Sequence, residues 1–128
     1  MSQPPLVCHV HVHVHRTVIR LEGAAGLEGQ PHLERAVTKA MAGKPAQVLV
    51  DARDLEFLAS LALGSLVTLS KSVRAGGGSV QVGGLRPAVQ EVFRRSRLEE
   101  LFEIVHELEV LEAMLAELES GGTPTSEP

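Results

Sequence analysis

The chain has 128 residues, of which 44% are hydrophobic and 22% charged, and its formal net charge is −4. This length fits one domain with an ordinary core, and the composition excludes collagen-like and highly charged disordered chains. No apolar run reaches the roughly 20 residues that a membrane-spanning helix needs, and the N-terminus lacks the features of a signal peptide. We therefore expect a cytoplasmic domain, and the single cysteine, Cys8, agrees with a reducing compartment.

Aromatic content and charge distribution exclude two classes of partner. The chain has no Trp, no Tyr and only three Phe, so it offers few ring surfaces on which bases could stack. Nine of its acidic residues lie between Glu99 and Pro128, where Lys and Arg are absent. Such an acidic surface repels nucleic acid and anionic membranes, so we expect neither as a partner.

The N-terminal third predicts a β-hairpin. Residues 1–5 form a polar, Pro-containing arm that we expect to be flexible, and residues 6–14 alternate with the period of a half-buried strand. The apolar set of this alternation is expected to face the core: Cys8, Val10, Val12 and Val14. A second β-rich run, 17–21, is expected to pair with the first, and residues 23–29 then read as a glycine-containing loop.

Helices and strands are expected to alternate through the rest of the chain. Helical spacing of apolar residues begins at Pro31, and a continuous apolar run at 47–51, typical of a buried parallel strand, ends in Asp51. Residues 54–59 are expected to connect this strand to the next helix. The remaining expected elements are a helix ending at Gly76, a strand at 79–82, a helix from Pro87, a short strand within 101–105, and a final helix with leucines from Leu108 to Leu118.

This order predicts an α/β fold. A mostly parallel central sheet would carry an antiparallel N-terminal edge hairpin and about four helices. One domain is expected at residues 6–119, followed by a Gly/Ser/Thr/Pro tail at 120–128 that we expect to be disordered.

Common catalytic signatures are missing from the sequence. The chain contains no Walker P-loop, no dinucleotide-binding glycine motif, no zinc-protease motif and no nucleophile elbow. The run Gly76-Gly77-Gly78 precedes a predicted strand, so it is a poor phosphate cradle and a better helix stop. We therefore expect a non-enzymatic protein without a cofactor.

The segment Asp51-Ala-Arg-Asp-Leu-Glu-Phe-Leu-Ala-Ser-Leu-Ala-Leu-Gly64 resembles the STAS family, the bacterial anti-sigma factor antagonists and their relatives. Family members have an apolar strand ending in Asp, then Phe and an apolar residue, then Asp-Ser-[Ser/Thr]-Gly at the start of a helix. The resemblance extends from about Thr17 to Leu115 and implies a single STAS-like domain. It includes Val18-Ile-Arg-Leu-Glu-Gly23, Arg74-Ala-Gly-Gly-Gly-Ser79 and Arg86-Pro-Ala-Val-Gln-Glu-Val-Phe93.

The resemblance also implies a function in transcription regulation. Family members bind an anti-sigma factor that is also a GHKL-type serine kinase, and phosphorylation of the serine matching Ser60 releases that partner. Asp51 would be a supporting acid. The implied partner-binding residues are Asp54, Glu56, Phe57, Leu58, Ala59, Ser60 and Leu61.

This chain departs from the family pattern beside the serine. Ala59 replaces the acid, Leu61 the second hydroxyl residue and Ala62 the glycine. One alternative is that Ser60 is a plain N-cap residue. Another is that the domain is a constitutive scaffold subunit of a larger assembly, such as a stressosome-like particle or a lipid-transport complex. A nucleoside-binding role, with Ser60 and the 23–29 loop as walls, also stays open.

The histidines of the first strand form a second candidate site. Alternate residues lie about 6.5–7 Å apart on one strand face, so neighbouring pairs could converge on Zn, Ni or Cu. The candidate ligands are His9, His11, His13 and His15. A solvated edge-strand face without a metal is the alternative, in which the histidines oppose unwanted edge pairing.

Overall fold

The computed structural model describes residues 4–13, 16–120 and 125–127. Residues 1–3, 14–15, 121–124 and 128 lie outside these ranges. Among them are Val14, which was predicted to face the core, and His15, a predicted metal ligand. The elements in chain order are β1 (Val7–Val12), β2 (Arg16–Ala25), α1 (Gln30–Ala42), β3 (Gln47–Leu58), α2 (Ser60–Ala75), β4 (Ser79–Gly83), α3 (Pro87–Arg95), the 3-10 helix η1 (Leu98–Glu100), β5 (Glu103–Val105), α4 (Leu108–Ser120) and β6 (Thr125–Glu127).

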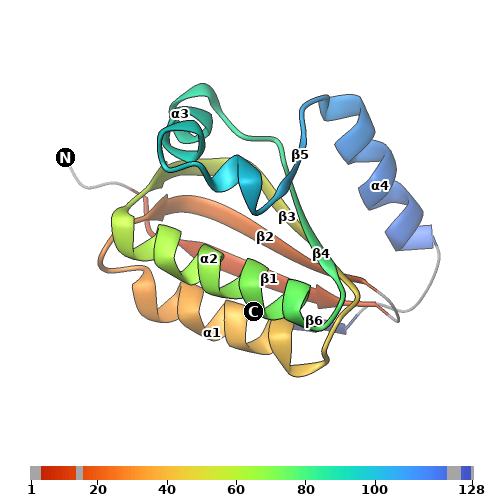
Figure 1. Ribbon diagram of the computed structural model, residues 1–128. Coiled ribbons are helices and arrows are strands. Elements are labelled where there is room, and N and C mark those ends of the chain that lie inside the picture. The colour runs from red at the N-terminus through yellow and green to blue at the C-terminus, as the bar shows by residue number, and fades with distance from the viewer. Residues whose placement is uncertain (1–3, 14–15, 121–124, 128) are drawn as a thin grey trace.

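A mixed sheet forms the centre of the domain, with strand order β5-β4-β3-β2-β1-β6 (Figure 1). Strands β1 and β2 pair antiparallel, while β2, β3, β4 and β5 run parallel to one another. The parallel pairs are joined through helices, as right-handed crossovers require. The predicted α/β fold, its parallel sheet, its antiparallel N-terminal hairpin and its four helices are confirmed.

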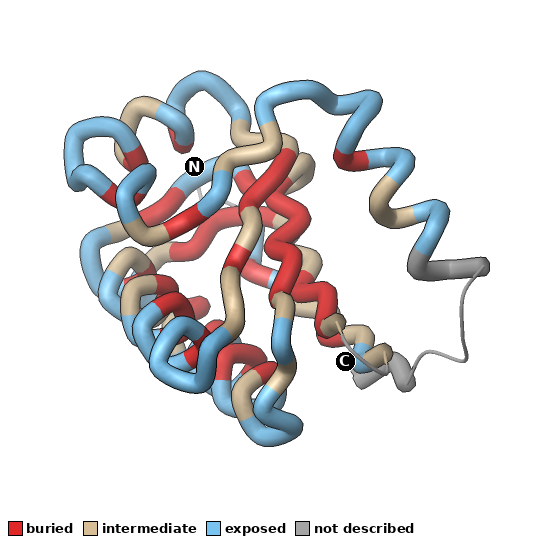
Figure 2. Tube along the Cα trace, turned by 45° about the vertical axis from the view of Figure 1, so that its right-hand side comes forward, coloured by how far each residue is buried: buried red, intermediate tan, exposed pale blue. Residues whose placement is uncertain are grey.

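One face of the sheet carries the main core. Helices α1, α2 and α3 contribute apolar side chains to a single buried cluster with the sheet, among them Leu33, Leu69 and Phe93. Figure 2 shows buried positions running along the central strands and the inner sides of these helices. The rings of Phe93 and Phe102 lie 5.6 Å apart at their centroids and join α3 to the segment before β5.

Helix α4 packs on the opposite face and covers only part of it. Its Leu111 is fully buried against Val18 and Leu49, which alternate along β2 and β3 with residues of the main core. The leucine stripe predicted for this helix holds at Leu111, but Leu108 is 51% exposed. The side chain of Leu118 lies outside the described part of the chain. A small second core therefore anchors α4 at its middle.

Strand β3 extends further than the sequence predicts. Residues 54–58, expected as a connection, continue the strand, and β2 extends through Gly23 to Ala25 where a loop was expected. The two extensions pair with each other, Gly23 with Leu55 and Ala25 with Leu58. The register shifts twice in this stretch, because β3 inserts extra residues opposite β2. Those irregularities hide the two-residue alternation by which a strand is recognised.

The β1 edge also differs from expectation. Val10 is buried, but Val12 is 38% exposed, so the prediction that Val12 faces the core is wrong. Along β1, Val10 is the last residue that lines the gap between this strand and α1, so the helix does not cover Val12. Within the tail predicted to be disordered, β6 pairs antiparallel with Val10–Val12.

Candidate functional site

The candidate site lies where β2 and β3 end and α2 begins. Ala24 pairs with Phe57 and Ala25 with Leu58, so the two strands finish side by side. The Ala59 backbone N–H then donates to the Ala25 carbonyl over 2.9 Å and fixes the turn into the helix. The parallel strands thus present the start of α2 at their carboxyl ends, where open α/β sheets commonly place their functional groups.

Ser60 is the first residue of α2, and its side chain is exposed. The N-cap is Ala59, in an extended conformation with φ −86° and ψ 166°, and no side chain caps this end. The first intrahelical bond runs from Leu63 N–H to the Ala59 carbonyl over 3.0 Å. The interpretation of Ser60 as an N-cap residue is therefore wrong. Its hydroxyl stands beside uncapped N–H groups at the positive end of a 16-residue helix.

Three large apolar side chains from the segments that meet at the start of α2 face solvent. Leu27 is 73% exposed, Phe57 40% and Leu61 56%. The neighbouring Leu58 is buried at 4%, so one member of the Phe57-Leu58 pair anchors the core and the other is available for contact. We call the group of Leu27, Phe57, Ser60 and Leu61 the α2 docking surface.

The start of α1 borders this surface. The side-chain amide nitrogen of Gln30 donates to Ser65 Oγ over 2.7 Å and to the Leu61 carbonyl over 3.4 Å. A Cβ added at Gly26 would lie 3.9 Å from the Phe57 ring, so the 26–29 loop sits against that side chain. Leu27 therefore comes from a segment that the sequence did not assign to the partner-binding residues.

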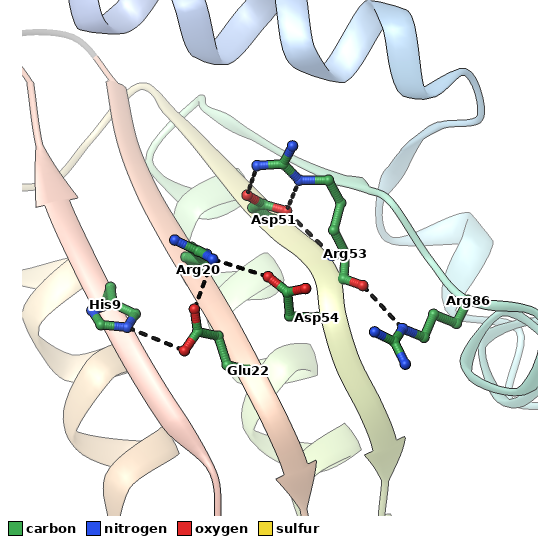
Figure 3. A network of polar contacts seen from close by, with 7 residues as sticks. All are labelled: His9, Arg20, Glu22, Asp51, Arg53, Asp54 and Arg86. Carbon is green, nitrogen blue, oxygen red and sulfur yellow. Dashed lines mark hydrogen bonds and ion pairs between the residues drawn. The ribbon is translucent and has the colours of Figure 1, made fainter.

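The two aspartates predicted near Ser60 belong to a polar network on the α4 face of the sheet (Figure 3). Asp51 is 2% exposed and accepts hydrogen bonds from the backbone N–H, Nε and Nη2 of Arg53, at 3.2, 3.0 and 2.9 Å. Asp54 accepts from Arg20 Nη2 over 3.0 Å. Both therefore take part in polar contacts on the strands, whereas Glu56 is exposed beside the docking surface.

The network crosses three neighbouring strands. Arg20 on β2 also contacts Glu22 at 2.8 Å, and His9 on β1 lies 3.6 Å from Glu22 (Figure 3). The hydrogen bond to Asp54 raises the pKa of the Arg20 guanidinium, and the bond to Asp51 does the same for Arg53. Sequence reasoning missed Arg20, because its contact with Asp54 depends on a strand register that the irregular β3 conceals. It also missed Glu22 and Arg53, because their contacts belong to no recognised motif.

The described histidines of the first strand form one stacked pair. The rings of His9 and His11 stack with centroids 6.5 Å apart, and these two residues and His13 are partly buried. The fourth predicted ligand, His15, lies outside the described residues. Within residues 4–13, 16–120 and 125–127, no three His, Cys, Asp or Glu side chains gather closely enough to hold a metal ion.

Helices of membrane-spanning length and hydrophobicity are absent from the part of the chain that the structure describes. No curated protein matches the sequence significantly. Solved structures match its fold. An anti-sigma factor antagonist from Mycobacterium paratuberculosis has a TM-score of 0.73 at 23% identity, with 87% of this chain and 92% of that chain covered. A STAS domain protein from Planctomyces limnophilus gives 0.68 at 23% identity, with 85% and 95% covered.

SpoIIAA of Bacillus in its phosphorylated form gives a TM-score of 0.61 at 19% identity, with 85% of this chain and 98% of that chain covered. These matches show that the fold is that of anti-sigma factor antagonists. A family model described as "Mlab, STAS domain" matches residues 8–120, which is most of the sequence. With both the fold and the sequence pattern in agreement, the chain belongs to the STAS family.

Proposed function

We propose that this protein is a non-enzymatic regulatory module that binds an anti-sigma factor of the GHKL serine kinase type through the α2 docking surface. The observation that carries the proposal is the exposure of Leu27, Phe57 and Leu61 at the end of the sheet where an exposed serine begins α2. The fold shared with anti-sigma factor antagonists supports the choice of partner.

Apolar contact area is the first part of the argument. Single exposed apolar residues are ordinary, but three of them at one end of a sheet support an interaction site there. Phe and large aliphatic side chains become favourable contacts once a partner removes them from water. Leu58 and the β2–β3 pairing hold the surrounding backbone in place, so little ordering is needed on binding.

Phosphorylation of Ser60 would switch this surface. A phosphate adds a charge of about −2, which the helix N-terminus and its unpaired N–H groups favour. The same charge would lie beside Leu27, Phe57 and Leu61, and burying it against a partner would be costly. A relative of the same fold was solved in a phosphorylated form, which supports a phosphorylation switch in this architecture.

A second candidate function is a constitutive subunit of a larger assembly. Ala59 and Leu61 replace the acidic and hydroxyl neighbours of the family serine, and Leu61 enlarges the apolar surface instead. In this case partner binding uses the same surface, without regulation at Ser60.

Titration calorimetry against the host's candidate kinase separates the two functions. If Ser60 is a switch, Ser60→Asp loses at least about tenfold in affinity, which is about 1.4 kcal/mol. Leu61→Ser weakens binding in both functions, because both use the docking surface. Ser72→Asp is the matched control, an exposed serine at the far end of α2, and its affinity stays unchanged.

Intact mass of the protein from its native host completes the test. A phosphoryl group on Ser60 that appears under one growth condition supports the switch. Unimpaired binding by Ser60→Asp, with no phosphorylated form, leaves the constitutive subunit. Unchanged binding by Leu61→Ser, with exchange protection confined to α4, would refute the docking surface itself.

A further inference from the structure

A groove runs between β1 and α1, and it shares no lining residue with the α2 docking surface. Its volume is about 220 Å³. Its lining combines apolar side chains of β1 and α1 with basic side chains of α1. The lining residues are Leu6, Val7, Cys8, Val10, His32, Arg35, Ala36 and Lys39.

The strand beside this groove is paired along only part of its outer edge. Strand β6 pairs with Val10–Val12, and in the described ranges no strand pairs with Val7–His9 on that side. Unpaired edge backbone is a template for another strand. The same edge already accepts an antiparallel strand over Val10–Val12, so a further segment in line with β6 would continue an existing ladder.

The residues of α1 that line the groove include Arg35 and Lys39, which are both basic, and His32. His32, Arg35 and Lys39 are spaced three and four residues apart, so they share one side of α1, and all three are exposed. The acidic residue of this part of the helix, Glu34, accepts a hydrogen bond from Gln30, which also bonds Ser65 on α2. The basic side of α1 thus faces the groove, and Glu34 belongs with the side that meets α2.

We propose that this groove binds an extended acidic segment of a partner protein, which adds a strand along Val7–His9. Alternate side chains of an added strand point to one face, so every second residue would face the side of the groove that carries Arg35. A second copy of this chain fits worse, because an isologous pairing at this edge would bring two basic rims together. The site is separate from the α2 docking surface and goes beyond the regulatory role proposed above.

The test uses a fluorescein-labelled peptide of alternating Glu and Val, titrated into the full chain and followed by fluorescence anisotropy. We expect saturable binding that weakens with salt, because charges on the rim contribute. Arg35→Glu should weaken binding about tenfold by placing a like charge beside the peptide. Lys71→Glu is the matched control, an exposed lysine on α2, and should leave the affinity within about twofold.

Two further measurements separate strand addition from loose charge attraction. Peptides N-methylated at odd or at even residues each lose one row of backbone donors, and only one of the two should bind. Cys8 is the single cysteine of the chain and lines the groove, so the bound peptide should slow its alkylation. Because burial raises the pKa of Cys8 to about 11, the reaction is followed at pH 9.

Several results would overturn the proposal. They are an absence of saturable binding, equal losses in Arg35→Glu and Lys71→Glu, and equal binding of both N-methylated peptides. Concentration-dependent dimerisation that Arg35→Glu strengthens, without peptide binding, would assign the edge to a second copy. None of these results depends on the α2 docking surface, so the two proposals fail or succeed separately.

Discussion

The two faces of the sheet differ in the interactions that cover them. Helices α1, α2 and α3 cover one face with a continuous apolar cluster. On the other face, Leu111 of α4 meets Val18 and Leu49, and the neighbouring strand positions carry charged residues paired across β1, β2 and β3. The first face stabilises the fold by burial, whereas the second gains little from its exposed ion pairs. Equivalent substitutions on the two faces should therefore have unequal effects.

The largest effect is expected at Leu69, which is fully buried in α2. Leu69→Ala should lower the free energy of unfolding by about 3 kcal/mol, because it removes apolar contact and leaves a cavity. The same change at Leu115, only partly buried on α4, should cost less. Urea denaturation of both variants gives the two values. Equal losses would mean that the second core contributes as much as the first.

An intermediate effect is expected at Gly83, where α4 meets the sheet. A Cβ there would lie 2.8 Å from Leu111 Cδ1, so Gly83→Ala should cost about 1–3 kcal/mol through overpacking. The helix should loosen while the main core holds, which a glutamate-specific protease would detect as faster cleavage within α4. Gly76→Ala is the control, because its nearest neighbour would be 3.6 Å away. Equal cleavage of both variants would contradict the predicted contact.

A smaller effect is expected at Arg20, although it bonds two carboxylates. The Arg20 side chain is 44% exposed and Asp54 47%, so solvent screens their attraction. Its Nε is buried without a hydrogen-bond partner, so replacement also removes an unsatisfied donor. Arg20→Met should change the free energy of unfolding by less than about 1 kcal/mol, and the change should shrink in high salt. A loss above 3 kcal/mol would show that the network supports the fold.

The smallest effect is expected from the histidines of β1. Replacing His9, His11 and His13 by Thr should shift stability by no more than about 0.5 kcal/mol each, because all three keep contact with solvent. Thr also has a high strand propensity. Thermal unfolding with and without a chelator is the measurement. A large loss in the variant, together with a chelator effect on the parent chain, would instead indicate a structural metal.

The sequence predicted the elements that have strong periodicity. Pro31 and Pro87 at helix starts, the apolar spacing of α1 and the buried strand from Gln47 were all placed correctly. Prediction failed beyond Asp51, because extra residues in β3 break the alternation and because charged residues there resemble a loop. Only the pairing with β2 shows that this stretch is a strand, and such long-range pairing leaves no local signal.

The candidate site was predicted unevenly for similar reasons. Ser60 and Phe57 came from a sequence pattern, and both are exposed near the start of α2. The cap position is shifted by one residue, to Ala59, because the backbone conformation and not the side chain decides where α2 begins. Leu27 was missed because it reaches the site only through the turn between β2 and α1, and a loop leucine gives no periodic signal.

Helix α1 touches both proposed binding surfaces. Gln30 at its start holds the Leu61 carbonyl, and Arg35 and Lys39 further along border the groove at β1. Gly29, which precedes α1, packs closely against Leu6, which precedes β1. If one ligand displaces α1, the free energy of that displacement also enters the affinity of the protein for the other ligand. Thermodynamic linkage then makes the coupling reciprocal, so that each ligand changes the other's affinity by the same factor.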